Sequence, residues 1–188
     1  MQNLRVVEPM ITIYDLEALP DDLNTYELFE GELSVAKAPS LKHQELIVRF
    51  STILTNYLDR NPIGRVWSTP GVIFDEYNSA IPDLIFIANE RIPQIASGIH
   101  VVGAPDLAIE IMSPGSENVR RDQIVKRQTY SRFGVKEYWI VEPIVEVIEI
   151  SRLQQNVLAS TGVFRNEDKI ESPLMPGLSF AVNDVFGR

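Results

Sequence analysis

Cysteine is absent from this sequence of 188 residues, and histidine occurs only twice, at His43 and His100. Without cysteine the chain can form no disulfide bond, no catalytic thiolate and no zinc site of the Cys type. Two histidines also leave little material for a metal centre rich in imidazole. Any metal bound by this chain would therefore be held by oxygen ligands.

Long hydrophobic runs are also missing. No stretch approaches the roughly 18 uninterrupted apolar residues of a membrane span, and the N-terminal residues lack the apolar segment of a secretory signal. We therefore expect a cytoplasmic protein with no membrane partner. With 45% hydrophobic residues and no internal repeat, the sequence predicts a single domain over residues 1–188.

Basic residues are in deficit. The sequence has 17 Lys and Arg against 26 Asp and Glu, a net charge of −9, which repels polyphosphate and counts against bulk electrostatic binding of nucleic acid. Residues 120–136 depart from this balance, because they include six basic residues and one acid. The basic residues are Arg120, Arg121, Lys126, Arg127, Arg132 and Lys136. Charge alone fits either local contact with phosphate or an ordinary solvated helix face.

Hydrophobic periodicity predicts two long helices. Between residues 41 and 60, apolar residues recur every three or four positions, which is typical of an amphipathic helix, and Ser40 is a suitable N-cap. Residues 117–133 form the second predicted helix, which Gly134 ends. A short helix followed by a polar turn is expected within residues 11–25.

Turn residues separate segments rich in β-branched and aromatic residues, which predict strands. A strand pair over residues 26–35 turns near Gly31. Further strands are predicted at residues 65–69, 71–77, 82–88, 106–113, 137–143, 145–151 and 156–164. This order of elements indicates an α/β fold, with one mixed β-sheet flanked by helices.

Two acidic residues interrupt apolar strands. Asp83 opens the strand that follows Pro82, which would place its carboxylate at the end of a sheet, although Pro-Asp is also common at turns. Glu110 interrupts an apolar run over residues 107–112, so a strand buried on both faces would place an ionisable group among hydrocarbon. If the sheet were covered on one face only, Glu110 would point to solvent instead.

The helix after the Glu110 strand carries Asp122, Lys126 and Tyr130 at four-residue intervals, so all three lie on one face. Asp122 and Lys126 have the spacing of an ordinary surface ion pair, worth only about 0.3–0.5 kcal/mol. A helix that packs back over the sheet would instead bring the lysine within reach of Glu110. Carboxylates beside a lysine suit metal-assisted hydrolysis of phosphodiester bonds, because oxygen ligands match Mg²⁺ and the lysine can orient the attacking water.

Several segments follow one another in a specific order: YELFEGEL, an early histidine, PDLIFIA, PDLAIEIMSP and DQIVKRQTYSRFGVKEYWIVEP. In this order the sequence resembles the Uma family of bacterial restriction-endonuclease-like proteins, within the PD-(D/E)XK nuclease superfamily. The resemblance runs from about Tyr14 to Pro143, and its last segment is the most specific. It implies a restriction-endonuclease-like core over about residues 14–143, followed by C-terminal strands within residues 144–188.

The resemblance also implies an activity and its metal ligands. The expected activity is that of a Mg²⁺-dependent endonuclease that cuts DNA as a homodimer, with Mn²⁺ as a substitute metal. Asp83 would be the motif aspartate, Glu110 the second metal-binding carboxylate, and the backbone carbonyl of Ile111 a third ligand.

By the same resemblance, Glu27 would supply the acidic residue that this superfamily often takes from an early element. Glu30 and Glu32 rank below it, because strand alternation places neighbouring positions on opposite faces. The sequence departs from the E-x-K pattern of the superfamily, since Met112 stands at the lysine position. The resemblance implies that this lysine has moved to the next helix, as Lys126.

Four further residues are candidates for contact with the substrate, on weaker evidence from the sequence than the carboxylates and Lys126. His43 lies near the start of the long helix, where it could touch the scissile phosphate or serve as a surface or capping residue. Arg120, Arg121 and Arg127 on the basic helix are candidate phosphate contacts.

Three other functions compete with a nuclease. A nuclease fold without turnover, acting as a binding or regulatory module, is favoured by the net charge and by Met112. A structural protein would be favoured if Asp83 and Glu110 lay far apart, because carboxylates that share an ion lie within about 4–6 Å. A glycosidase also uses a carboxylate pair, but it would leave the lysine unexplained.

Overall fold

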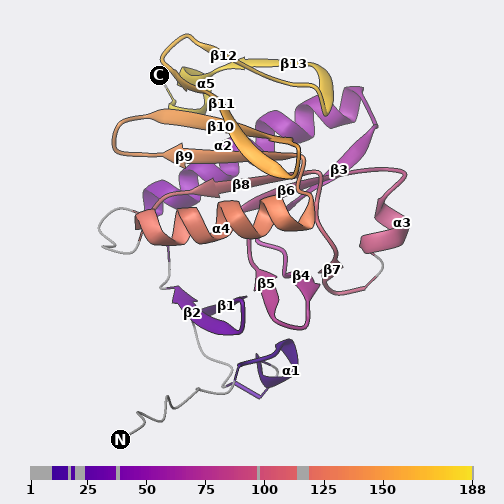
Figure 1. Cartoon of the computed structure of the whole chain (residues 1–188). Helices are drawn as coiled ribbons and strands as arrows, with labels where there is room; N and C mark the ends of the chain where they lie inside the picture. Colours follow the sequence, from indigo (N-terminus) through magenta and orange to yellow (C-terminus); the bar gives the residue numbers. More distant parts are fainter. Residues whose placement is uncertain are drawn as a thin grey trace, which may run out of the picture.

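The computed structural model describes residues 10–16, 18–19, 24–36, 39–96, 98–113 and 119–187, without the side chains of residue 36 and residues 119–122. The predicted α/β fold is confirmed (Figure 1). The helices are α1 (Ile13–Leu16), α2 (Leu41–Arg60), α3 (Ile92–Ile95), α4 (Val119–Phe133) and α5 (Val182–Phe186). The strands are β1 (Thr25–Phe29), β2 (Glu32–Ala36), β3 (Gly64–Ser68), β4 (Val72–Asp75), β5 (Asn78–Ala80), β6 (Leu84–Ala88), β7 (Val101–Val102), β8 (Leu107–Ile111), β9 (Glu137–Glu142), β10 (Val147–Gln154), β11 (Val157–Arg165), β12 (Lys169–Ser172) and β13 (Met175–Ala181).

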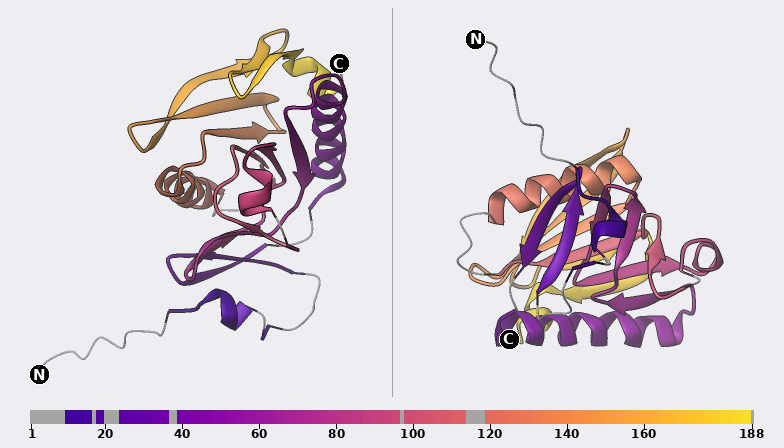
Figure 2. Two further views of the ribbon diagram at one scale, coloured as in Figure 1. Left: turned by 90° about the vertical axis from the view of Figure 1, so that its right-hand side faces the viewer. Right: turned by 90° about the horizontal axis from the view of Figure 1, so that it is seen from below.

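The central sheet has six strands in the order β11-β10-β9-β8-β6-β3. Strands β8 and β9 are parallel and are joined through α4, whereas the other neighbours are antiparallel. Helices α2 and α4 lie on opposite faces of this sheet (Figure 2). The expectation of one sheet was wrong, because β2-β1-β5-β4-β7 form a second sheet and β12-β13 a separate hairpin.

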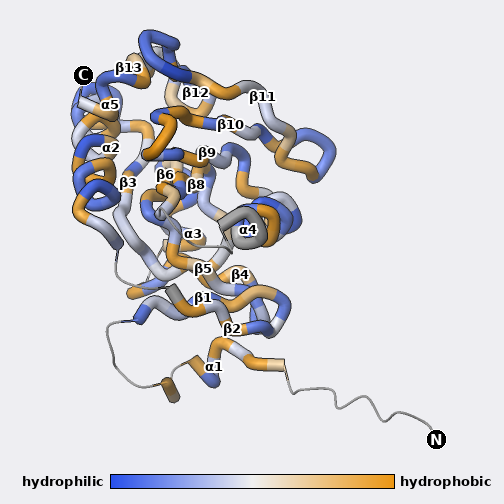
Figure 3. Tube along the Cα trace, turned by 90° about the vertical axis from the view of Figure 1, so that its left-hand side faces the viewer, coloured by the Kyte–Doolittle hydropathy of each residue, from blue (hydrophilic) through white to orange (hydrophobic). Residues whose placement is uncertain are grey.

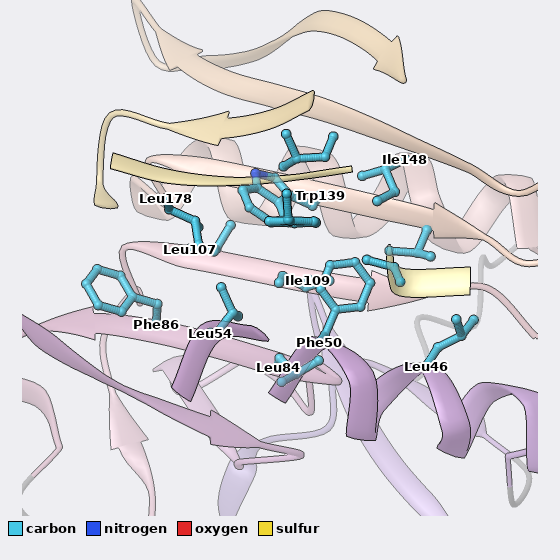
Figure 4. Packing of buried hydrophobic residues seen from close by; sticks show 14 of the residues in the cluster. Leu46, Phe50, Leu54, Leu84, Phe86, Leu107, Ile109, Trp139, Ile148 and Leu178 are labelled. Carbon is cyan, nitrogen blue, oxygen red and sulfur yellow. The ribbon is translucent and has the colours of Figure 1, made fainter. Parts of the chain in front are cut away.

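Strand β8 is buried on both faces, as its apolar run predicts. Leu107, Ile109 and Ile111 belong to the main core, together with residues of α2 (Figure 4). Ala108 packs on the other face with the core that includes Tyr130 of α4. Strand alternation therefore directs Glu110 toward α4, away from the main core.

Helix α2 has the bounds that its periodicity predicts. Ser40 is its N-cap, and the Ser40 side chain accepts a hydrogen bond from the His43 amide at 3.2 Å. Apolar and polar residues alternate along the helix (Figure 3), and Leu46, Phe50 and Leu54 are fully buried against the sheet. This burial fixes the rotation of α2 about its axis, which also decides where His43 points.

The second sheet lies beside one end of the central sheet (Figures 1 and 2). Strand β1 pairs with β2 through a turn at Glu30 and Gly31, both with positive φ, and also pairs with β5. Strand β5 leads through residues 81–83 directly into β6 of the central sheet. The second sheet therefore delivers residues of β1 to the point where β6 begins.

The C-terminal part covers the α2 side of the core. The strands expected after residue 143 are present, and β12 and β13 contribute buried apolar side chains to the main core. Helix α5 was not expected, and it buries Val182, Val185 and Phe186 there. Among the described residues, no helix is long and apolar enough to cross a membrane.

Candidate active site

Antiparallel pairing of β6 with β8 brings two acidic residues together. Leu84, the first residue of β6, pairs with Ile109 of β8, so Asp83 lies beside the end of β8 that holds Glu110. The Ile111 amide donates a hydrogen bond of 2.7 Å to Oδ2 of Asp83. Asp83 and Glu110 therefore lie at neighbouring strand ends, and their carboxylates interact electrostatically.

Glu27 reaches the same place from the second sheet. It is buried on β1, and its Oε1 accepts a hydrogen bond of 2.9 Å from the Ile81 amide, just before Pro82 and Asp83. Oε1 also lies 2.9 Å from Nζ of Lys126. Glu27 thus connects the turn that carries Asp83 to helix α4.

Helix α4 places Lys126 and Tyr130 over Glu110. Nζ of Lys126 donates to both carboxylate oxygens of Glu110 at 3.1 Å, and the Tyr130 hydroxyl donates to Oε1 at 2.7 Å. The Lys126 side chain is only 14% exposed, so the reading of Lys126 as an ordinary surface residue was wrong. The prediction that the lysine faces Glu110 is confirmed in its geometry, while its chemical role stays a prediction.

Burial and charge shift the proton affinities in this cluster. Burial raises the pKa of Glu110 to about 7; Lys126 opposes this shift, Asp83 and Glu27 reinforce it, and the Tyr130 hydroxyl opposes it. Burial by itself would lower the pKa of Lys126, but Glu110 and Glu27 raise it above its ordinary value. Lys126 is therefore a stable ammonium, and Glu110 takes up a proton more readily than an ordinary glutamate does.

The charges at the site do not balance. Among the described side chains, Glu110 interacts with the carboxylates of Asp83 and Glu27 and with the Lys126 ammonium, which also contacts Glu27. A buried cluster with excess negative charge is costly unless a proton or a cation compensates it. Further positive charge, from a proton or a cation, would therefore stabilise the site.

The donor set fits a hard divalent cation by its chemistry, because carboxylate oxygens are the ligands that Mg²⁺ prefers. Within the described part of the chain, no three His, Cys, Asp or Glu side chains form a ready metal-binding group. The Lys126 ammonium instead lies between Glu27 and Glu110. The use of the Ile111 carbonyl as a ligand stays a prediction.

The remaining residues considered from the sequence differ in how deeply they are buried. His43 is buried, so the reading of it as a surface residue was wrong; its Nε2 lies 3.1 Å from Oδ2 of Asp83. Glu30 and Glu32 are exposed on the second sheet, away from the buried position of Glu27. Met112, two residues after Glu110, is partly buried.

The basic helix offers less free positive charge than its sequence suggests. Arg127 pairs with Glu149 at 2.8 Å, Arg132 pairs with Glu30, and Lys136 lies 2.7 Å from Asp106. These ion pairs partly neutralise the basic residues, although the Arg132 and Lys136 side chains stay about half exposed to solvent. The side chains of Arg120, Arg121 and Asp122 lie outside the described residues, and the predicted phosphate contact of Arg127 stays a prediction.

Two parts of the site were not foreseen. The hydrogen bond from the Tyr130 hydroxyl to Glu110 was not predicted, and it follows from the position of Tyr130 one helical turn after Lys126. The Ile81 amide has no signal in the sequence, because a backbone donor carries no side chain to mark it.

Raising the pH is expected to destabilise the metal-free protein through Glu110. The folded state holds the Glu110 proton more tightly than the unfolded chain, so this stabilisation is fully present below pH 4.5 and is lost as the pH rises through about 7. The loss should be on the order of 1–3 kcal/mol. Urea unfolding in EDTA at pH 5.5 and pH 8 measures it, with Glu110→Gln as the comparison. Equal pH dependence in both proteins would contradict the shift.

Comparisons with known proteins show which family and which fold this chain resembles. A family model, Uma2, described as "Putative restriction endonuclease", matches residues 13–183. A crystal structure of "a putative nuclease belonging to DUF820" from Anabaena variabilis matches with a TM-score of 0.78 and 22% sequence identity, over 94% of this chain and 98% of that chain. This likeness confirms the expected fold. No curated protein matches the chain.

Proposed function

This chain belongs to the Uma2 family, and we propose that it is a nuclease that hydrolyses phosphodiester bonds of DNA by metal-assisted attack of water. The family supports a nuclease. The proposal of a metal is carried by the excess of negative charge among the described side chains of the site, where the carboxylates of Glu27 and Asp83 both act on Glu110 and Lys126 is the ammonium beside them. A divalent cation would supply the missing charge and also bind a phosphate oxygen of the substrate.

The proposed ligands are the carboxylates of Asp83 and Glu110 and the backbone carbonyl of Ile111. A bound Mg²⁺ or Mn²⁺ would lower the pKa of water and stabilise the charge that develops on the phosphoryl group. Ionised Glu110 is needed for this role, and its raised pKa means that a proton leaves when a cation arrives.

The remaining residues hold these ligands and the substrate in place. Lys126 carries a permanent positive charge beside Glu110, where it can orient the attacking water and stabilise charge on phosphate. Glu27 holds Lys126 through Oε1, and the Tyr130 hydroxyl fixes Glu110. Each of these contacts restrains a side chain before substrate arrives, which is the main requirement of phosphoryl-transfer catalysis.

A second candidate function is a binding or regulatory module that retains the nuclease fold without turnover. It is favoured by the position of the Lys126 ammonium, which lies between two carboxylates of the site, and by the net charge of −9. Such a module would bind nucleic acid or another partner whether or not a divalent metal is present.

Removing the metal is expected to abolish cleavage. Purified protein should nick supercoiled plasmid and cut single-stranded DNA with Mg²⁺ or Mn²⁺ and should be inert in EDTA. Glu110→Gln, purified in the same way, controls for contaminating nucleases. Nicking of a closed circle would identify an endonuclease, and sedimentation equilibrium would test the proposed homodimer. A wild type that stays inert in every metal would place the binding module first.

A further inference from the structure

The Asp83 carboxylate is held by one of its two oxygens. Oδ2 accepts the Ile111 amide at 2.7 Å and lies 3.1 Å from Nε2 of His43. Among the described residues, none donates a hydrogen bond to Oδ1 of Asp83. The Ile111 hydrogen bond and the His43 contact both fall on Oδ2, so together they restrain the carboxylate and leave Oδ1 as the oxygen available to a cation.

His43 is itself held firmly. Its backbone amide donates to the Ser40 side chain in the first turn of α2, and the burial of that helix against the core sets the direction of the side chain. The imidazole is only 7% exposed. A side chain so enclosed has little surface to offer a phosphate of the substrate, so direct contact with DNA is a poor explanation of its place.

The atoms that face the two ring nitrogens of His43 indicate which nitrogen carries a hydrogen. A carboxylate oxygen that already accepts one hydrogen bond needs a donor from His43, so Nε2 carries the hydrogen. Nδ1 is buried and has no hydrogen-bond partner among the described residues. A hydrogen on Nε2 facing the carboxylate, with Nδ1 unpartnered, is therefore the arrangement that this geometry supports.

We propose that His43 is a positioning residue, which orients Asp83 through its Nε2–H so that Oδ1 binds the divalent cation of the nuclease site. This inference rests on the function proposed above. Around metals, a carboxylate commonly orients a histidine that binds the metal. Here the roles are exchanged, because the histidine orients the carboxylate that would bind the metal. A histidine that only filled space in the core would contribute nothing to the affinity for the metal.

Three variants test this role. His43→Leu keeps the bulk of the side chain and removes the donor. His43→Gln keeps an N–H close to the position of Nε2. His100→Leu is the matched control, because His100 is exposed and is the only other histidine in the chain. For each protein, Mg²⁺ affinity is measured by calorimetry, stability by urea unfolding in EDTA, and plasmid cleavage as separate kcat and KM values.

We expect His43→Leu to weaken Mg²⁺ binding about 10- to 100-fold and to lower kcat at a fixed Mg²⁺ concentration, with KM for DNA changed less than about threefold. His43→Gln should recover most of the affinity, and His100→Leu should match the wild type. Nitrogen-15 NMR of labelled histidine, with His100→Leu used for assignment, should show hydrogen on Nε2 of His43 and none on Nδ1.

Three results would overturn the proposal. The first is a folded His43→Leu that binds Mg²⁺ as tightly as wild type. The second is a His43→Gln that is as weak as His43→Leu, which would point to a requirement for the ring. The third is hydrogen on Nδ1 in place of Nε2. Failure of the nuclease proposal looks different, because then the wild type itself would neither bind Mg²⁺ nor cut DNA, and both ideas would fall together.

Discussion

Replacing Lys126 with methionine is expected to lower cleavage about 10²- to 10⁴-fold and to reduce the free energy of unfolding by about 3–5 kcal/mol. Methionine keeps the aliphatic stem and removes the ammonium, which contacts Glu27 at 2.9 Å and Glu110 at 3.1 Å. Both carboxylates are largely buried, so they would lose their shared counter-ion with little water to replace it. The activity falls because the charge that orients water and faces the phosphate is gone.

The loss of stability should depend on pH and on Glu110. At pH 5.5 a proton on Glu110 would replace part of the missing charge, so Lys126→Met should be least harmful there and most harmful at pH 8. The double variant Lys126→Met/Glu110→Gln should recover part of the stability and none of the activity. Urea unfolding at both pH values and plasmid cleavage with Mg²⁺ measure these effects.

Lys42→Met is the matched control for this change. Lys42 also forms an ion pair with a glutamate, Glu45, at 3.2 Å, but both side chains are more than 40% exposed. Its loss should leave both the free energy of unfolding and the cleavage rate close to those of the wild type. If Lys126→Met cut DNA as fast as wild type while folded, the lysine would have no part in catalysis and the binding module would become the better reading.

Strong local patterns made much of the fold predictable. Helix α2 could be placed to the residue, because its apolar spacing and its N-cap Ser40 agree. Strand β8 could be recognised as buried on both faces from its continuous apolar run, and that recognition made Glu110 conspicuous. Lys126 could be placed near Glu110 because a helix that joins two parallel strands must pack back over the sheet.

The division of the strands into separate sheets could not be predicted. Strands β5 and β7 have only three and two residues, too few to show a periodicity, and they decide which strands join the second sheet. Glu27 was chosen on resemblance alone, because its approach to Lys126 depends on the pairing of β1 with β5. The contact between His43 and Asp83 joins residues 40 positions apart and depends on the exact rotation of α2.

Asp83→Asn is expected to separate activity from stability. Loss of the charge on Asp83 removes a cation ligand, so cleavage should fall at least ~10³-fold, since a metal contributes several kcal/mol to the transition state. The asparagine oxygen can still accept from Ile111 and His43, and the site has excess negative charge. In EDTA the variant should therefore be at least as stable as wild type.

Asp106→Asn should show the opposite behaviour, which makes it the matched control. Asp106 precedes β8 and is 1% exposed, with Arg91 at 2.9 Å and Lys136 at 2.7 Å. Burial alone would raise the pKa of Asp106, but the Ala88 amide, Lys136 and Arg91 hold it below its usual range, so its ionised form stabilises the fold above the pKa of the unfolded chain. Asp106→Asn should lose about 1–3 kcal/mol at pH 7 and keep its cleavage rate. Urea unfolding in EDTA and plasmid cleavage with Mg²⁺ are measured for both variants. Asp83→Asn loses activity but not stability, and Asp106→Asn loses stability but not activity, only if Asp83 serves the reaction and Asp106 serves the fold. An Asp83→Asn protein that is unstable and still active would reverse the assignment.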